Sequence, residues 1–142
     1  MASFVFSSST TQPPMAVTDF FVDLGNLLRW DPTVTRVERL FEGEPGVGSR
    51  FAVDIDTGST KLSFVYEIVE LEPGRLVRAR AEDSRFVSDD LVEVDEEDGA
   101  TSYRYTARLE GKGLWNLADP LLAASLGKIG KRASAGLVAA LG

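Results

Sequence analysis

The chain has 142 residues, enough for one domain with a sizeable hydrophobic core. It contains no cysteine and no histidine, which excludes disulfides, thiol nucleophiles, histidine general bases and metal sites built on imidazole or thiolate. The net charge of −7 argues against nucleic-acid binding, and no stretch approaches the ~20 apolar residues of a transmembrane helix. Any catalysis would have to use carboxylates, hydroxyls, lysine, arginine or bound water, and we expect no metal and no cofactor.

The N-terminal segment, residues 3–10 (SFVFSSST), is rich in β-forming residues and serine and predicts a short first strand. The same end of the chain lacks the basic start and the apolar run of a secretory signal peptide. We therefore expect a cytoplasmic protein.

Residues 13–30 change to helical spacing. Apolar residues recur three and four positions apart and form one stripe: Val17, Phe20, Phe21, Leu24, Leu27 and Leu28. Pro13 and Pro14 suit a helix start, and Gly25 suggests a break into two short helices. Pro32 disfavours helical geometry at the residue before it, so the helical stretch should end at or before Trp30.

From residue 33 to 111, apolar residues alternate with polar ones, as expected of strands with one buried face. Turn signals separate the runs at Pro45-Gly46, Thr57-Gly58, Pro73-Gly74 and Asp98-Gly99. The pattern predicts six antiparallel strands. The side chains expected to face inward are those of Phe51, Val53, Ile55, Phe64, Tyr66, Ile68, Val77, Ala79, Phe86, Val92, Tyr103, Tyr105 and Leu109. Charged residues of opposite parity are expected to pair on the exposed face: Asp54, Asp56, Arg78, Arg80, Glu82, Arg104 and Arg108.

Residues 113–141 return to helical spacing, and Asp119-Pro120 marks a helix start or kink. About 20 helical residues after that point would span roughly 30 Å, enough to cross a domain of this size. This helix carries many small residues, which either allow close contact with the sheet or leave a cavity. They are Ala123, Ala124, Gly127, Gly130, Ala133, Ser134, Ala135 and Gly136. An antiparallel sheet must cover its apolar face, and this helix is the only large cover. We therefore predict an α+β fold, one domain over residues 1–142, with a curved antiparallel sheet wrapped around a long C-terminal helix.

Three segments carry a resemblance to a known family. "TDFFVDLGNLLRWDPTV" resembles the first helix and the following tryptophan-proline of the START-related (SRPBCC) superfamily, in its polyketide cyclase/dehydrase-like branch. "GVGSRF" is similar to the start of that family's third strand, and "YEIVELEPGRLV" to its fourth-to-fifth hairpin. The resemblance implies a helix-grip fold with an apolar cavity between sheet and helix. Members bind lipids, sterols, quinones, polyketides or plant hormones, and only some are enzymes.

One carboxylate falls on the inward parity of its strand. Ser88 and Asp90 share the parity of Phe86 and Val92. An inward aspartate is costly unless it is paired or protonated, and burial would raise its pKa, which makes Asp90 the best general acid/base candidate. The alternative is a β-bulge that turns Ser88 to Asp90 outward.

Other candidates also have two interpretations. Each tyrosine could be ordinary core or could line a pocket. Trp30 could close the edge of the core, or it could gate a cavity mouth together with Leu27 and Leu28. The residues predicted to contact a ligand are Trp30, Phe51, Val53, Phe64, Tyr66, Phe86, Ser88, Tyr103, Tyr105, Leu122 and Leu126.

Three functions remain open from the sequence, in order of preference. The first is binding or transport of a small hydrophobic or aromatic molecule in the sheet–helix cavity. The second is a polyketide cyclase/dehydratase-like enzyme in which Asp90 and a tyrosine (Tyr66 or Tyr103) move protons. The third is a quinone or lipid chaperone that meets a membrane or a partner through the basic last helix.

Overall fold

The computed structural model describes the backbone of residues 2–58 and 61–142, and the side chains of this set except those of residues 116–126. The strands are β1 (Ala2–Thr10), β2 (Val34–Arg39), β3 (Arg50–Asp56), β4 (Lys61–Glu72), β5 (Leu76–Glu82), β6 (Phe86–Glu97) and β7 (Ala100–Gly111). The helices are α1 (Pro14–Val22), α2 (Leu27–Trp30) and α3 (Asp119–Leu141), with short 3₁₀ segments η1 (Leu24–Asn26) and η2 (Gly113–Ala118).

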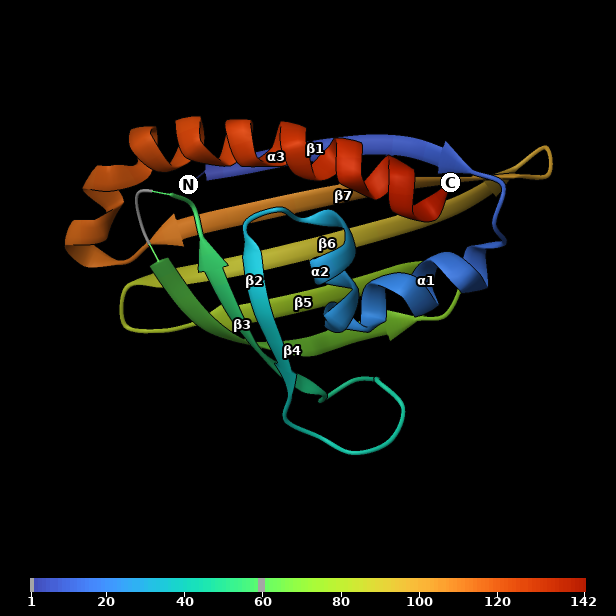
Figure 1. Cartoon of the computed structure of the whole chain (residues 1–142), viewed down its shortest axis with the longest axis horizontal. Helices are drawn as coiled ribbons and strands as arrows, with labels where there is room; N and C mark the ends of the chain where they lie inside the picture. Colours follow the sequence, from blue (N-terminus) through green and yellow to red (C-terminus); the bar gives the residue numbers. More distant parts are fainter. Residues whose placement is uncertain (1, 59–60) are drawn as a thin grey trace.

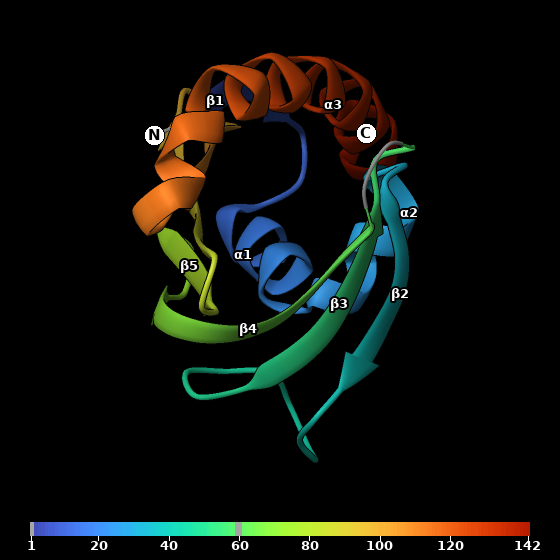
Figure 2. The ribbon, with the colours of Figure 1, turned by 90° about the vertical axis from the view of Figure 1, so that its left-hand side faces the viewer.

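The strands form one antiparallel sheet in the order β1-β7-β6-β5-β4-β3-β2. The sheet curls into an open half-barrel, and α3 lies across its open side (Figures 1 and 2). At one end, α1 packs against β5 and β6, and α2 lies between β2 and α3. The predicted fold, a curved antiparallel sheet that grips a C-terminal helix, is thus confirmed.

The local signals act at the positions that the sequence predicted. Helix α1 begins at Pro14, the chain breaks around Gly25 into two short helices, and α2 ends at Trp30. Asp31 has extended geometry, with φ −101° and ψ 107°, because Pro32 follows it. Asp98 and Gly99 both have positive φ, 53° and 79°, and make the tight turn between β6 and β7.

Strand parity placed the core correctly. Ten of the side chains predicted to face inward are buried: Phe51, Val53, Phe64, Tyr66, Ile68, Val77, Ala79, Phe86, Val92 and Tyr103. The other three, Ile55, Tyr105 and Leu109, are partly buried and pack against this core. Alternation held because the β3–β4, β5–β6 and β6–β7 registers run without interruption, and the one shift in the β4–β5 ladder comes after Ile68, the last inward residue predicted on β4.

Two glycines of α3 allow close approach. A Cβ at Gly136 would overlap the backbone carbonyl of Trp30, and a Cβ at Gly130 would overlap the ring of Phe4. In contrast, nothing lies within 4 Å of the position that a Cβ at Gly127 would take. The small residues of α3 therefore serve close contact at these two points, and a cavity also remains beside them.

Within the described residues, no helix is both long enough and apolar enough to cross a membrane.

Candidate functional site

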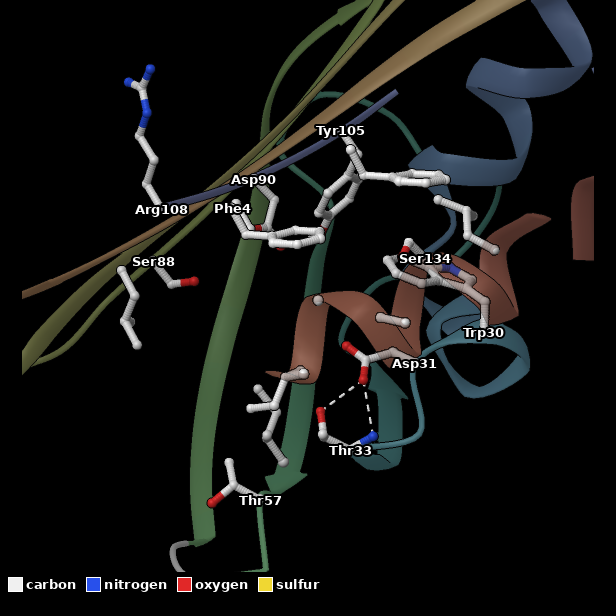
Figure 3. Close-up of a pocket in the computed structure, with 18 of the residues that line it drawn as sticks. Phe4, Trp30, Asp31, Thr33, Thr57, Ser88, Asp90, Tyr105, Arg108 and Ser134 are labelled. Carbon is white, nitrogen blue, oxygen red and sulfur yellow. Dashed lines mark hydrogen bonds between the residues drawn. The ribbon is translucent and has the colours of Figure 1, made fainter. Parts of the chain in front are cut away.

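A cavity of about 140 Å³ lies between the sheet and α3 (Figure 3). Aromatic and aliphatic side chains make most of its wall: Phe4, Phe6, Trp30, Ile55, Leu62, Phe64, Tyr66, Tyr105, Leu109, Ile129 and Leu137. A second cavity of about 60 Å³ lies toward α1 and α2. The residues that border both cavities are Trp30, Asp31, Ile55, Tyr66, Asp90 and Tyr105. The two cavities therefore adjoin at a boundary that carries two carboxylates.

Asp90 points into this space from β6. It pairs in register with Ala79 of β5 and Ala107 of β7, and no bulge interrupts either ladder. The alternative of an outward-turning bulge is therefore wrong. Its Oδ2 accepts a hydrogen bond of 2.9 Å from the hydroxyl of Tyr105. Burial raises the pKa of Asp90 to about 7, the nearby Asp31 carboxylate adds to the rise, and the Tyr105 hydrogen bond opposes it. A carboxyl group with this pKa can give or take a proton near neutral pH.

A second polar pair lies on the same wall. The hydroxyls of Tyr66 and Ser88 share a buried hydrogen bond of 2.6 Å between β4 and β6. Burial raises the pKa of Tyr66 and, together with the Asp90 carboxylate, that of Tyr105. Both phenols therefore stay protonated at neutral pH and act as hydrogen-bonding groups.

Asp31 is a site residue that the sequence interpretation missed. Its Oδ1 accepts hydrogen bonds from the backbone N–H of Thr33 at 2.9 Å and from the Thr33 hydroxyl at 2.7 Å (Figure 3). Burial raises the pKa of Asp31, and these two hydrogen bonds oppose the rise. The Asp-Pro-Thr run after a helix end is typical of such an Asx turn and was the available signal.

Trp30 connects the helical region to the cavities. Its side chain is only 6% exposed, and its ring meets that of Tyr105 edge-on with centroids 5.4 Å apart. It borders both cavities, and so does Tyr105. Leu27 lines the smaller cavity, whereas Leu28 is exposed and lines neither. A gating role for Trp30 and Leu27 stays a prediction.

The other predicted ligand contacts divide into three groups. Phe64 lines the larger cavity and Val53 the smaller one. Three predicted contacts line neither cavity, because their rings pack against other rings. Phe51 packs against Phe41, and Phe86 packs against Trp115. Tyr103 packs against Phe6 and Phe21. Leu122 and Leu126 lie outside the described side chains.

The charged residues that alternate with the inward apolar side chains face outward, as predicted. Arg78 binds Asp89 through two hydrogen bonds of 2.6 and 3.1 Å. Arg108 borders the larger cavity, but its guanidinium points away from the other lining residues (Figure 3). Among the described residues, no cluster of three or more Asp or Glu side chains could hold a metal ion.

The comparisons with known proteins agree with this geometry. A family model described as "Polyketide cyclase / dehydrase and lipid transport" matches residues 1–142. No curated protein matches the chain.

Solved structures share the fold at low sequence identity. A START superfamily protein from Mycobacterium smegmatis has a TM-score of 0.78 at 12% identity, with 99% of this chain and 97% of that chain covered. The Zhui aromatase/cyclase from Streptomyces sp. R1128 has a TM-score of 0.73 at 15% identity, with coverage of 98% and 90%. TTHA0849 from Thermus thermophilus has a TM-score of 0.70 at 17% identity and 99% coverage of both chains. With a family match over its whole length, the chain belongs to the polyketide cyclase/dehydrase and lipid transport family.

Proposed function

We propose that this protein binds a small hydrophobic or aromatic molecule in the cavity between the sheet and α3. The observation that carries the proposal is the cavity itself, whose wall is mostly aromatic and aliphatic with a few inward polar groups. This is the usual composition of a small-molecule site. Its volume of about 140 Å³ is close to that of an engineered apolar cavity, about 150 Å³, which takes up benzene. The cavity therefore suits a body of about one ring, and a larger ligand would extend into the second cavity.

Native mass spectrometry of freshly purified protein tests this proposal. We expect either a discrete adduct that is lost on denaturation or, for an empty cavity, uptake of small aromatic probes such as indole or toluene. Ala107→Leu should abolish uptake because Ala107 lines the cavity. Val65→Leu is the matched control, since Val65 is exposed on β4. A wild-type protein that neither carries an adduct nor takes up a probe would refute the proposal.

A second function has one specific observation in its favour. The pKa of Asp90 lies near 7, and the Tyr105 hydroxyl is held 2.9 Å from its Oδ2, which supports acid–base chemistry on a bound carbonyl compound. An aromatase/cyclase with the same fold supports this interpretation as an analogy. Asp90→Asn keeps the shape of the side chain. If the protein is an enzyme of this kind, the variant should still bind the probes but should lose turnover. Equal turnover by Asp90→Asn would exclude Asp90 as the proton-transfer group.

Lipid or quinone transport is the remaining outcome of the same experiment. An adduct with the mass of a lipid or quinone would identify the bound molecule and favour this function over the other two.

A further inference from the structure

Two carboxylates face the junction of the cavities, and each has one oxygen without a partner among the described residues. Asp90 accepts a hydrogen bond from Tyr105 through Oδ2. Asp31 accepts both of its hydrogen bonds from Thr33 through Oδ1. Within the part of the chain that the structure describes, no group donates to Asp90 Oδ1 or Asp31 Oδ2. In Figure 3 both side chains point toward the centre of the lining residues. These two oxygens are therefore available to a ligand.

No basic side chain of the described residues balances these carboxylates. The ion pairs between described residues involve neither Asp31 nor Asp90. The only basic residue among those described along either cavity is Arg108, whose guanidinium points away (Figure 3). Residues 59, 60 and 116–126 include no lysine, arginine or histidine. Asp31 and Asp90 are both partly buried. A partly buried carboxylate is less favourable without a cation than with one, and a ligand could supply that positive charge.

Aromatic rings surround the same junction. Trp30 and Tyr105 pack edge-on with centroids 5.4 Å apart, and Tyr66 completes the shared wall. Phe4 and Phe64 extend this surface into the larger cavity. The face of an aromatic ring attracts an ammonium group, most strongly where water is excluded. Carboxylates and aromatic faces together complement an organic cation better than they complement an anion or a hydrocarbon.

We propose that the ligand is an amine cation, with its ammonium group between Asp31 and Asp90 and an apolar body of about one ring in the larger cavity. This inference rests on the proposed function, because it requires the cavity to be a binding site, and it adds the chemical class of the ligand. The groups that face Asp90 are the hydroxyl of Tyr105 on β7, the hydroxyl of Tyr66 on β4 and the carboxylate of Asp31 after α2. None of them supplies a positive charge.

Two probes of nearly equal shape separate this idea from simple apolar binding. Benzylamine is a cation at pH 7.5, and benzyl alcohol is neutral. We expect calorimetry on the full chain to show benzylamine binding about tenfold more tightly than benzyl alcohol, the size of one charge-assisted contact. Asp31→Asn and Asp90→Asn should each weaken benzylamine binding about fivefold or more and change benzyl alcohol binding less than about twofold. Benzyl alcohol binding also reports that each variant keeps a folded cavity.

Asp54→Asn is the matched control, because Asp54 lies on the exposed face beside Ser63 and Arg36. It should change neither affinity. Two results would overturn the proposal that the ligand is a cation and leave the binding function standing. One is that benzyl alcohol binds as tightly as benzylamine. The other is that neither Asp31→Asn nor Asp90→Asn weakens benzylamine binding. Binding of neither probe to protein that carries no adduct in native mass spectrometry would overturn both.

Discussion

The carboxylate of Asp90 should give the protein a distinctive dependence of stability on pH. Its pKa in the folded protein is about 7, against 3.8 for an exposed aspartate, chiefly because the cavity wall desolvates the charged form. Between these values the unfolded chain has released the proton while the folded protein still holds it. The stabilisation by protonated Asp90 is therefore complete below pH 3.8 and is lost as the pH rises through 7.

The magnitude follows from the size of the shift. Each pKa unit corresponds to about 1.4 kcal/mol, so a rise from 3.8 to about 7 corresponds to a loss of up to about 4 kcal/mol. Asp90→Asn removes the titrating group but keeps an oxygen that can accept from Tyr105. Urea denaturation of wild type and Asp90→Asn at several pH values between 4 and 8 measures the effect, since every other group titrates in both proteins.

We expect the wild type to lose stability relative to Asp90→Asn as the pH rises. Asp89→Asn is the matched control on the same strand, because Asp89 faces outward and binds Arg78. Because Asp89→Asn retains Asp90, the wild type should show no such pH-dependent loss relative to Asp89→Asn. A difference between wild type and Asp90→Asn that stays constant within about 0.5 kcal/mol across the range would refute a desolvated Asp90.

Three further predictions concern packing and hydrogen bonding. Gly136→Ala should destabilise the protein by about 2 kcal/mol or more, because the added Cβ would overlap the Trp30 carbonyl. Gly127→Ala in the same helix should stabilise the protein by up to about 1 kcal/mol, since its Cβ would meet nothing. Equal effects of the two substitutions in thermal denaturation would contradict the packing of α3. Tyr66→Phe should lower the free energy of unfolding by about 1–2 kcal/mol, because it leaves the buried Ser88 hydroxyl without its partner. Adding Ser88→Ala should restore part of that loss in a double-mutant cycle. Strictly additive losses would show that the two hydroxyls are not coupled. Acrylamide should quench the fluorescence of Trp115, which is 46% exposed, much more than that of the buried Trp30. The fluorescence of the Trp115→Phe variant should therefore be nearly resistant to acrylamide. Strong quenching of that variant would contradict a buried Trp30.

Much of the candidate site was predictable because it lies on strands. The two-residue period of β6 carries Ser88, Asp90 and Val92 on one face, and burial of the apolar members fixes the polar ones beside them. The same reasoning placed Tyr66 and Phe64 on the cavity wall. It could not separate cavity wall from solid core, and Phe51, Phe86 and Tyr103 follow the same alternation while packing against other rings.

The sequence by itself determined the order of elements, the buried face of strands β3 to β7, the end of α2 at Trp30 and the start of α3 at Asp119. These features depend on local period and on backbone geometry at proline and glycine. Only the tertiary structure decided that Asp31 and Asp90 border the same two cavities. These residues lie on a loop and on a strand far apart in the chain, and no local pattern carries their distance. The cavity also arises only when α3 closes on the curled sheet, since its size depends on how far Gly130 and Gly136 let the helix approach.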